Sequence, residues 1–216
     1  MKYIVKTDEP EVLAKFKAQE NEEWQPNYDN FSGREKREFH SHLITEQGHI
    51  CCYCGQRIQE DDSHIEHFRP QAKHPHLELD YFNLLTSCQK QLEPKDPKHC
   101  GMGKDDWFDD QLLVSPLIPD CADFFEYTLD GQILPSRQSE KAKSAKETID
   151  RMSLNIRKLQ AAREGAIASL DIPELTLDEI DKLIYSYDRI DPNGKYSSYC
   201  QAIVYVLKQE KFYLQA

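Results

Sequence analysis

The chain has 216 residues, a formal net charge of −11 and a mean hydropathy of −0.74, values typical of a polar, acidic protein with one domain or two small ones. No apolar run approaches the roughly 20 residues needed to span a bilayer, and residues 1–6 lack the apolar core of a signal peptide. We therefore expect a cytoplasmic protein without membrane contact, whose seven cysteines are reduced thiols.

The acidic residues are unevenly distributed, which matters because nucleic-acid binding depends on basic side chains. Residues 105–135 contain eight acidic residues and no basic one, whereas residues 64–104 contain six Lys or Arg and five Asp or Glu. The acidic segment is typical either of a solvated loop region or of a surface that faces a basic partner. In both cases we expect the chain alone to bind nucleic acid weakly.

The first half of the chain predicts helices followed by a short sheet. Residues 7–20 and 34–47 have helical patterns, with Pro10 suited to a first turn and Gly48 to the position after a helix end. A knuckle and a short strand are expected within residues 51–70. After a loop, order resumes at residues 83–88, and a short helix begins near residue 100 and ends near residue 108.

The second half of the chain predicts one hairpin and then helices. Residues 124–129 and 132–134 are expected to form strands around the turn Asp130-Gly131. Helices follow from residue 139, with Asn155 as a candidate N-cap, a break at Ile172-Pro173, and a capping-box pattern at Thr176 and Glu179.

The terminal segment, residues 196–212, is predicted to be an amphipathic helix with an apolar stripe at Tyr199, Ile203, Val206 and Leu207. The stripe belongs either to the protein's own core or to a surface that docks a partner. We expect the chain to divide into a metal-centred part, residues 1–136, and a helical part, residues 137–216, which is the candidate region for partner docking.

Four cysteines have positions suited to one metal site. Cys51 and Cys54 form a C-x-x-C pair followed by Gly55, the spacing of a zinc knuckle. Cys88 and Cys100 could complete a tetrahedral thiolate site, with His99 as an alternative to Cys100. The remaining cysteines are expected to be structural: Cys52, Cys121 and Cys200.

Glu66 and His67 stand side by side in a strand-like segment that ends at Pro70. A carboxylate suits a hard divalent cation, and an imidazole suits general-base work near neutral pH. Strict strand alternation would place the two side chains on opposite faces. Both can reach one site only if the strand ends or twists there, which Pro70 permits.

Together these motifs resemble the HNH endonuclease superfamily, whose site is a ββα-metal unit. The resemblance is carried by the cysteine knuckle, by Glu66-His67 before Pro70, by Asn83-Leu84 with Cys88, and by the segment from Cys100 to Lys104. Within that superfamily the chain most resembles PtuB of Septu anti-phage defence systems and the HNH proteins encoded with retrons. The resemblance implies an α+β fold, in which a small ββα-metal (HNH) module with structural zinc is flanked by N-terminal helices and a helical C-terminal part.

The resemblance also implies roles for individual residues. His67 would be the general base, Glu66 would help to hold one catalytic Mg²⁺ or similar divalent cation, and Asn83 would brace the loop that carries His67. Many HNH proteins have a second metal ligand directly after the last cysteine, where this chain has Gly101. The candidate replacements are His99, Asp105 and Asp106.

The function implied by the resemblance is metal-dependent cleavage of nucleic acid, with DNA as the expected substrate. The chain would be the effector of a phage-defence complex that includes an ATPase of the PtuA type. An RNA-directed nuclease of the same complex and a catalytically inactive, zinc-bound interaction module are the alternatives.

Overall fold

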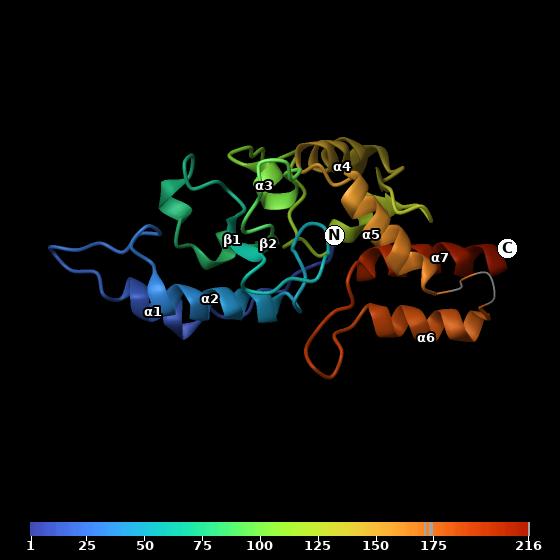
Figure 1. Ribbon diagram of the computed structural model, residues 1–216, viewed down its shortest axis with the longest axis horizontal. Coiled ribbons are helices and arrows are strands. Elements are labelled where there is room, and N and C mark those ends of the chain that lie inside the picture. Colours follow the sequence, from blue (N-terminus) through green and yellow to red (C-terminus); the bar gives the residue numbers. More distant parts are fainter. Residues whose placement is uncertain (171, 173–174, 216) are drawn as a thin grey trace.

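The computed structural model describes residues 1–170, 172 and 175–215, and within them the chain combines helices with two small antiparallel sheets. This is an α+β arrangement. Figure 1 shows α1 and α2 beside the first sheet at one end of the molecule, with α5, α6 and α7 grouped at the other end. None of the described helices has both the length and the apolar composition that crossing a bilayer requires.

The N-terminal helices are α1 (Glu11–Lys17) and α2 (Gly33–Glu46). The first is shorter than predicted, because Pro10 is extended and caps the helix instead of lying inside it. Their apolar faces pack on β2 through a buried cluster: Leu13, Phe16, Phe31, Phe39, Leu43 and Leu84. This cluster fixes α2 beside the first sheet.

The first sheet and the helix after it form a ββα unit at the centre of the chain. Strands β1 (Ser63–His67) and β2 (Leu84–Cys88) pair antiparallel, with Ser63 opposite Cys88 and His67 opposite Leu84. Helix α3 (Cys100–Lys104) is tied to β2, since the backbone N–H of Gly101 donates to Ser87 Oγ at 3.0 Å. The 3₁₀ turns Pro75–Leu77 and Tyr81–Asn83 lie in the connection between the strands.

The second sheet is the predicted hairpin. After a 3₁₀ turn at Cys121–Phe124, β3 (Phe125–Tyr127) pairs with β4 (Ile133–Pro135). Gly131 has a φ of +78° at the turn, a conformation that glycine adopts without strain. The hairpin and its turn are therefore confirmed.

Helices α4 (Ser139–Arg151), α5 (Arg157–Ala168), α6 (Leu177–Tyr187) and α7 (Cys200–Gln215) complete the chain. The capping box of α6 is confirmed, with both reciprocal bonds between Thr176 and Glu179. The predicted cap at Asn155 is wrong: its side chain bonds the backbone of Ile133 on β4, and Ile156 occupies the N-cap without a side-chain bond. Pro173, part of the predicted break, lies outside the described residues.

The apolar stripe of α7 is part of the protein's own core. Of the two alternatives for this stripe, core or docking surface, the structure therefore favours the core. The members of the stripe are between 0% and 7% exposed and share a cluster with side chains of α5 and α6: Ile203, Val206 and Leu207 of α7, and Tyr199 directly before the helix. The alternative in which this stripe docks a partner is therefore wrong. The exposed apolar side chains of α7 lie farther along, at Phe212, Tyr213 and Leu214.

A second hydrophobic core surrounds the cysteine knuckle and crosses the boundary expected at residue 137. It contains Cys51 and Cys100 together with α4 residues such as Ala145 and Ile149. The acidic segment folds against the same region, since Asp110 pairs with Arg69 and Asp120 pairs with Lys141. Some of its carboxylates therefore neutralise basic side chains of this chain.

Candidate metal and active site

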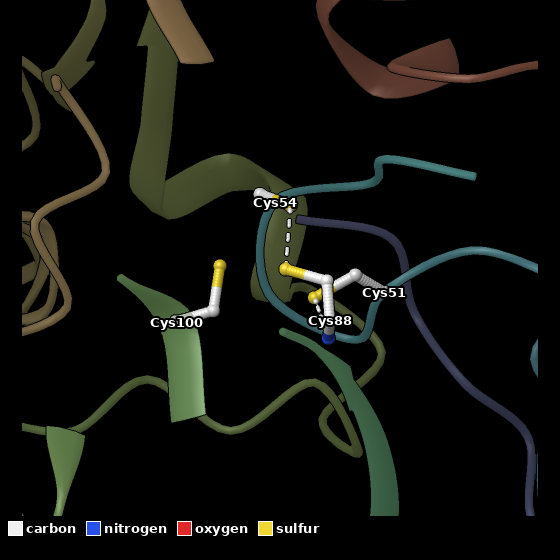
Figure 2. A group of neighbouring side chains, drawn as sticks. All are labelled: Cys51, Cys54, Cys88 and Cys100. Atoms are coloured by element: carbon white, nitrogen blue, oxygen red, sulfur yellow. Dashed lines mark hydrogen bonds between the residues drawn. The ribbon is translucent and has the colours of Figure 1, made fainter. Parts of the chain in front are cut away.

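Four cysteine sulfurs from separate parts of the chain meet in one place (Figure 2). Cys51 and Cys54 come from the knuckle, Cys88 ends β2, and Cys100 begins α3. All four sulfurs lie within 4.8 Å of one another, and three of the four residues are buried. The structure thus brings together the cysteines that the sequence singled out, and they could hold a metal ion.

The spacing of the sulfurs fits a tetrahedral thiolate site. The Sγ atoms of Cys54 and Cys88 are 3.8 Å apart, and bonds of about 2.3 Å to one zinc ion would separate two sulfurs by about 3.8 Å. Backbone N–H groups point at the sulfurs: those of Cys88 and Gln56 donate to Cys51 Sγ and Cys54 Sγ at 3.4 and 3.5 Å. Such donors favour the thiolate form that binds metal.

His99 lies beside this cluster and not beside Glu66. Its Nδ1 is 3.2 Å from the sulfur of Cys100 and 3.7 Å from that of Cys88, and its side chain is buried. The other three cysteines are buried and lie outside the cluster, as expected for structural residues: Cys52, Cys121 and Cys200.

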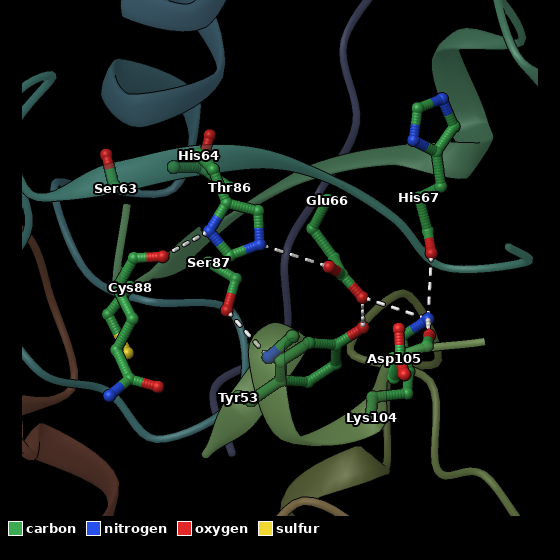
Figure 3. A network of polar contacts seen from close by, with 12 residues as sticks. Tyr53, Ser63, His64, Glu66, His67, Thr86, Ser87, Cys88, Lys104 and Asp105 are labelled. Carbon is green, nitrogen blue, oxygen red and sulfur yellow. Dashed lines mark hydrogen bonds and ion pairs between the residues drawn. The ribbon is translucent and has the colours of Figure 1, made fainter. Parts of the chain in front are cut away.

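Figure 3 shows Glu66 and His67 pointing away from each other at the end of β1. The alternation expected of a strand is therefore retained up to His67, and Pro70 does not bring the two side chains to one face. Lys104 of α3 links them: its Nζ is 3.1 Å from Glu66 Oε1 and donates to the backbone oxygen of His67 at 3.0 Å.

Glu66 is a buried carboxylate with three polar neighbours. Oε1 accepts from the hydroxyl of Tyr53 at 3.0 Å and pairs with Lys104, while Oε2 is 3.3 Å from His64 Nε2. Burial acts to raise the pKa of Glu66, but the hydrogen bond from His64 and the charge of Lys104 outweigh it and hold that pKa below its usual value. Glu66 is thus a carboxylate anion, the form that binds a cation.

The imidazole of His67 is held on the opposite face of β1. Its Nε2 lies 3.1 Å from the backbone oxygen of Glu78, and its ring packs edge-on against Tyr28 at 4.4 Å between centroids. A carbonyl oxygen only accepts, so Nε2 carries the hydrogen and Nδ1 keeps its lone pair. Burial lowers the pKa of His67, with a partial offset from the Glu78 carbonyl.

Asn83 bridges the two ends of the loop between β1 and β2. Its Oδ1 accepts from the backbone N–H of Arg69 at 2.7 Å, and its Nδ2 donates to the backbone oxygens of Arg69 and Leu77 at 3.0 and 3.1 Å. The side chain is buried and makes three hydrogen bonds to backbone groups, so its contacts fix the backbone that follows His67.

The sequence reasoning missed His64, which lies two residues before Glu66 on the same face of β1. Strand alternation was the available signal, since residues i and i+2 share a face. The candidate ligands that the sequence suggested, His99, Asp105 and Asp106, make no contact with Glu66 among the described hydrogen bonds and ion pairs. Asp105 and Asp106 have exposed side chains, and their backbone oxygens accept from Lys104 and Lys73.

A hollow of about 350 Å³ opens between α2 and β1, next to His64. Three cations and no carboxylate are among its lining residues, which include Tyr28, Lys36, Arg37, His64 and Lys90. Lys36 Nζ lies 3.7 Å above the ring of Tyr28, the same ring that packs against His67. The hollow is therefore locally basic in a chain that is acidic overall.

No family model matches the chain. Among curated proteins, it matches a protein of Vibrio cholerae serotype O1 biovar El Tor named "Retron Vc95 putative HNH endonuclease", with 32% identity over 133 residues. The chain is thus similar to a protein named as a retron HNH endonuclease. The match covers 59% of this chain and 62% of the Vibrio protein, so the chain spans less than two thirds of that relative's length. The expected resemblance to the HNH superfamily is confirmed.

Proposed function

We propose that the protein is a metal-dependent HNH endonuclease that cleaves phosphodiester bonds of nucleic acid, with DNA as the preferred substrate. The observation that carries this proposal is the ββα unit, in which Glu66 at the end of β1 faces the start of α3 and His67 follows it. Once it holds a metal ion, the cysteine cluster would fasten α3 to β2 at that point, because Cys88 ends β2 and Cys100 begins α3. The match to a retron HNH protein supports the same assignment.

In this proposal His67 accepts a proton from the attacking water at Nδ1. The hydrogen bond from Nε2 to the Glu78 carbonyl fixes the orientation of the ring and leaves Nδ1 free to accept the proton. Asn83 does no chemistry and keeps the backbone after His67 in place. General-base catalysis by such a group contributes about 10²- to 10⁴-fold.

Glu66 would hold a catalytic Mg²⁺ or a similar divalent cation through its carboxylate. When bound, such a cation offsets the negative charge that develops on the phosphate and the leaving oxygen. Separately, the cluster Cys51, Cys54, Cys88 and Cys100 would hold structural zinc, because four thiolates at tetrahedral spacing favour zinc over a hard cation.

The basic hollow beside β1 supports a nucleic-acid substrate. Lys36, Arg37 and Lys90 line it, and a phosphate backbone lying there would pass close to His64 and the ring of Tyr28. Three cations are few for phosphate binding, so we expect weak, salt-sensitive affinity in the isolated chain. An ATPase partner of the PtuA type would supply the missing contacts and gate the nuclease in a phage-defence complex. The resemblance to Septu PtuB and the retron name of the relative support that role.

Two observations favour the inactive alternative: the buried ion pair with Lys104 satisfies one oxygen of Glu66 without a cation, and His67 points to the face of β1 opposite Glu66 (Figure 3). Cleavage assays distinguish an active nuclease from an inactive module and DNA from RNA as the substrate. The purified chain, alone and with its ATPase, is incubated with plasmid DNA and with RNA in the presence of Mg²⁺ or Mn²⁺. We expect DNA cleavage that EDTA and His67→Ala abolish, while the exposed His76→Ala control remains active. Cleavage of RNA alone would favour the RNA-directed nuclease, and full activity of His67→Ala would refute the proposed base.

A further inference from the structure

We infer that His64 is the second protein ligand of the catalytic cation, sharing it with Glu66 in place of the missing ligand on α3. The inference rests on the proposed nuclease function, but the metal site that it describes can be measured without any cleavage assay.

The positions of the two side chains are the first argument. His64 and Glu66 lie on the same face of β1, and His64 Nε2 is 3.3 Å from Glu66 Oε2 (Figure 3). Two ligands at right angles on one cation, each about 2.1 Å from it, would be about 3 Å apart. The observed separation is close to that of a shared cation. Glu66 Oε2 is also the oxygen that Lys104 and Tyr53 leave free.

The hydrogen-bond pattern of His64 is the second argument. Its Nδ1 lies 2.8 Å from the backbone oxygen of Gln89, so Nδ1 carries the hydrogen and donates it. Nε2 is then the nitrogen that faces Glu66 Oε2, and in the neutral ring its lone pair is available to a cation that both side chains share. A histidine whose second nitrogen donates to a backbone carbonyl is also the usual arrangement of a metal ligand.

The lack of space at Gly101 also supports the assignment of His64 as a ligand. A Cβ at Gly101 would overlap Glu66 Oε2 and would lie 2.9 Å from His64 Nε2. The position at which many HNH proteins place their second ligand therefore has no room for a side chain here. The space next to the carboxylate is filled from β1 by His64, so the ligand has moved from the helix to the strand.

Access and chemistry agree with this assignment. Glu66 is buried, but the side chain of His64 is 23% exposed and lines the basic hollow through which a hydrated cation or a phosphate could arrive. An imidazole binds Mn²⁺, Co²⁺ or Ni²⁺ more readily than Mg²⁺, which prefers oxygen. We therefore expect the site to favour transition-metal ions more than an all-oxygen site would.

The test uses the full chain loaded with zinc at the cysteine cluster, and Mn²⁺ as the probe. Mn²⁺ affinity is measured from the free-ion electron paramagnetic resonance signal, and pulsed measurements on the bound ion detect coupling to a nearby imidazole nitrogen. Relative to wild type, we expect His64→Ala to weaken Mn²⁺ binding by at least about 10- to 100-fold, the loss seen when a ligand's supporting partner is removed. The nitrogen coupling should disappear.

Two further variants separate a ligand from a merely structural partner. His64→Gln keeps a polar side chain of similar length and serves if His64→Ala fails to fold, as judged by circular dichroism; it should also lose the nitrogen coupling. His76→Ala removes an exposed histidine and should retain both affinity and coupling. Unchanged Mn²⁺ affinity in both His64 variants, or bound Mn²⁺ without nitrogen coupling in the wild type, would overturn the inference. So would a wild-type chain that binds no Mn²⁺.

The two proposals fail in different ways. If Mn²⁺ binds through His64 and the wild type cleaves neither DNA nor RNA, the nuclease function falls and the metal site stands. If the wild type cleaves and the His64 variants bind Mn²⁺ normally, the metal site falls and the function stands.

Discussion

Gly101 of α3 lies against the carboxylate of Glu66 on β1, with no space between them for a side chain: a Cβ at Gly101 would come 2.9 Å from Glu66 Cδ. The contact joins the helix and the strand of the ββα unit at their closest point. Any larger residue at position 101 must push Glu66 or α3 aside.

We therefore predict that Gly101→Ala lowers the free energy of unfolding by roughly 1–3 kcal/mol, the usual cost of overpacking. The matched control is Gly165→Ala in α5, where an added Cβ meets no atom within 4 Å. That change should raise the free energy of unfolding by roughly 0.5–1 kcal/mol, since alanine favours helix. Urea denaturation measures both, and equal effects of the two substitutions would contradict the crowding at Gly101.

If the cysteine cluster holds zinc as proposed, replacing Cys54 by Ser should remove that zinc and destabilise the fold. Structural zinc supplies on the order of ten kcal/mol in small zinc-finger peptides, so the loss should be large even if part of the core remains. Atomic emission on freshly purified protein measures the metal, and a thermal melt measures stability. Cys200→Ala, outside the cluster, is the control and should keep one zinc per chain. Zinc content that is unchanged in Cys54→Ser would remove this residue from the site.

Ending the chain at Asn193 should unfold the part that contains α5 and α6. Three aliphatic side chains of α7 that are 6% exposed or less, Ile203, Val206 and Leu207, would be lost, together worth roughly 5–9 kcal/mol. A chain that ends after Gln209 removes mainly exposed residues and should remain folded. Helical content and urea denaturation compare the two. Equal stability would mean that the α7 stripe is not core.

The stability of the protein should fall in mild acid, and His40 should account for part of the loss. Burial lowers the pKa of His40 to about 4, whereas the unfolded chain titrates near 6.5. Below pH 6.5 the unfolded chain therefore binds a proton at His40 that the folded chain does not bind. The free energy of unfolding falls as a result, until the pH drops through about 4 and the folded chain is protonated as well. At pH 5 the contribution is roughly 2 kcal/mol.

Urea denaturation at pH 7 and pH 5 checks this contribution. His40 Nε2 lies 3.2 Å from Ser63 Oγ, so His40→Asn keeps a polar partner for that hydroxyl while removing the titration. The variant should lose less stability than wild type between the two pH values. An identical loss would show that other groups carry the whole effect.

The sequence predicted most reliably where short-range contacts decide the structure. The capping box of Thr176 and Glu179 and the turn at Gly131 depend on residues within a few positions, and both are present. Asn155 was assigned wrongly because its side chain bonds a strand 22 residues away. A local sequence pattern cannot show that the backbone of Ile133 competes with the start of α5 for the side chain of Asn155.

In the candidate site, the sequence identified the four cysteines but not the arrangement around Glu66. Alternation along β1 was enough to separate Glu66 from His67, and the same rule pairs Glu66 with His64. What the pattern could not supply was the approach of α3, which brings Lys104 to the carboxylate and leaves Gly101 without space. These contacts join residues about 35 positions apart, and only the folded chain sets them.

The order of the cysteines along the chain has a consequence for synthesis. Cys51 and Cys54 leave the ribosome roughly 2–10 seconds before Cys100 at ordinary elongation rates. During that interval a metal ion bound at the knuckle would have at most part of its four-sulfur shell and would exchange readily. The shell would be completed only when Cys100 arrives with α3, at the step that also closes the ββα unit around Glu66.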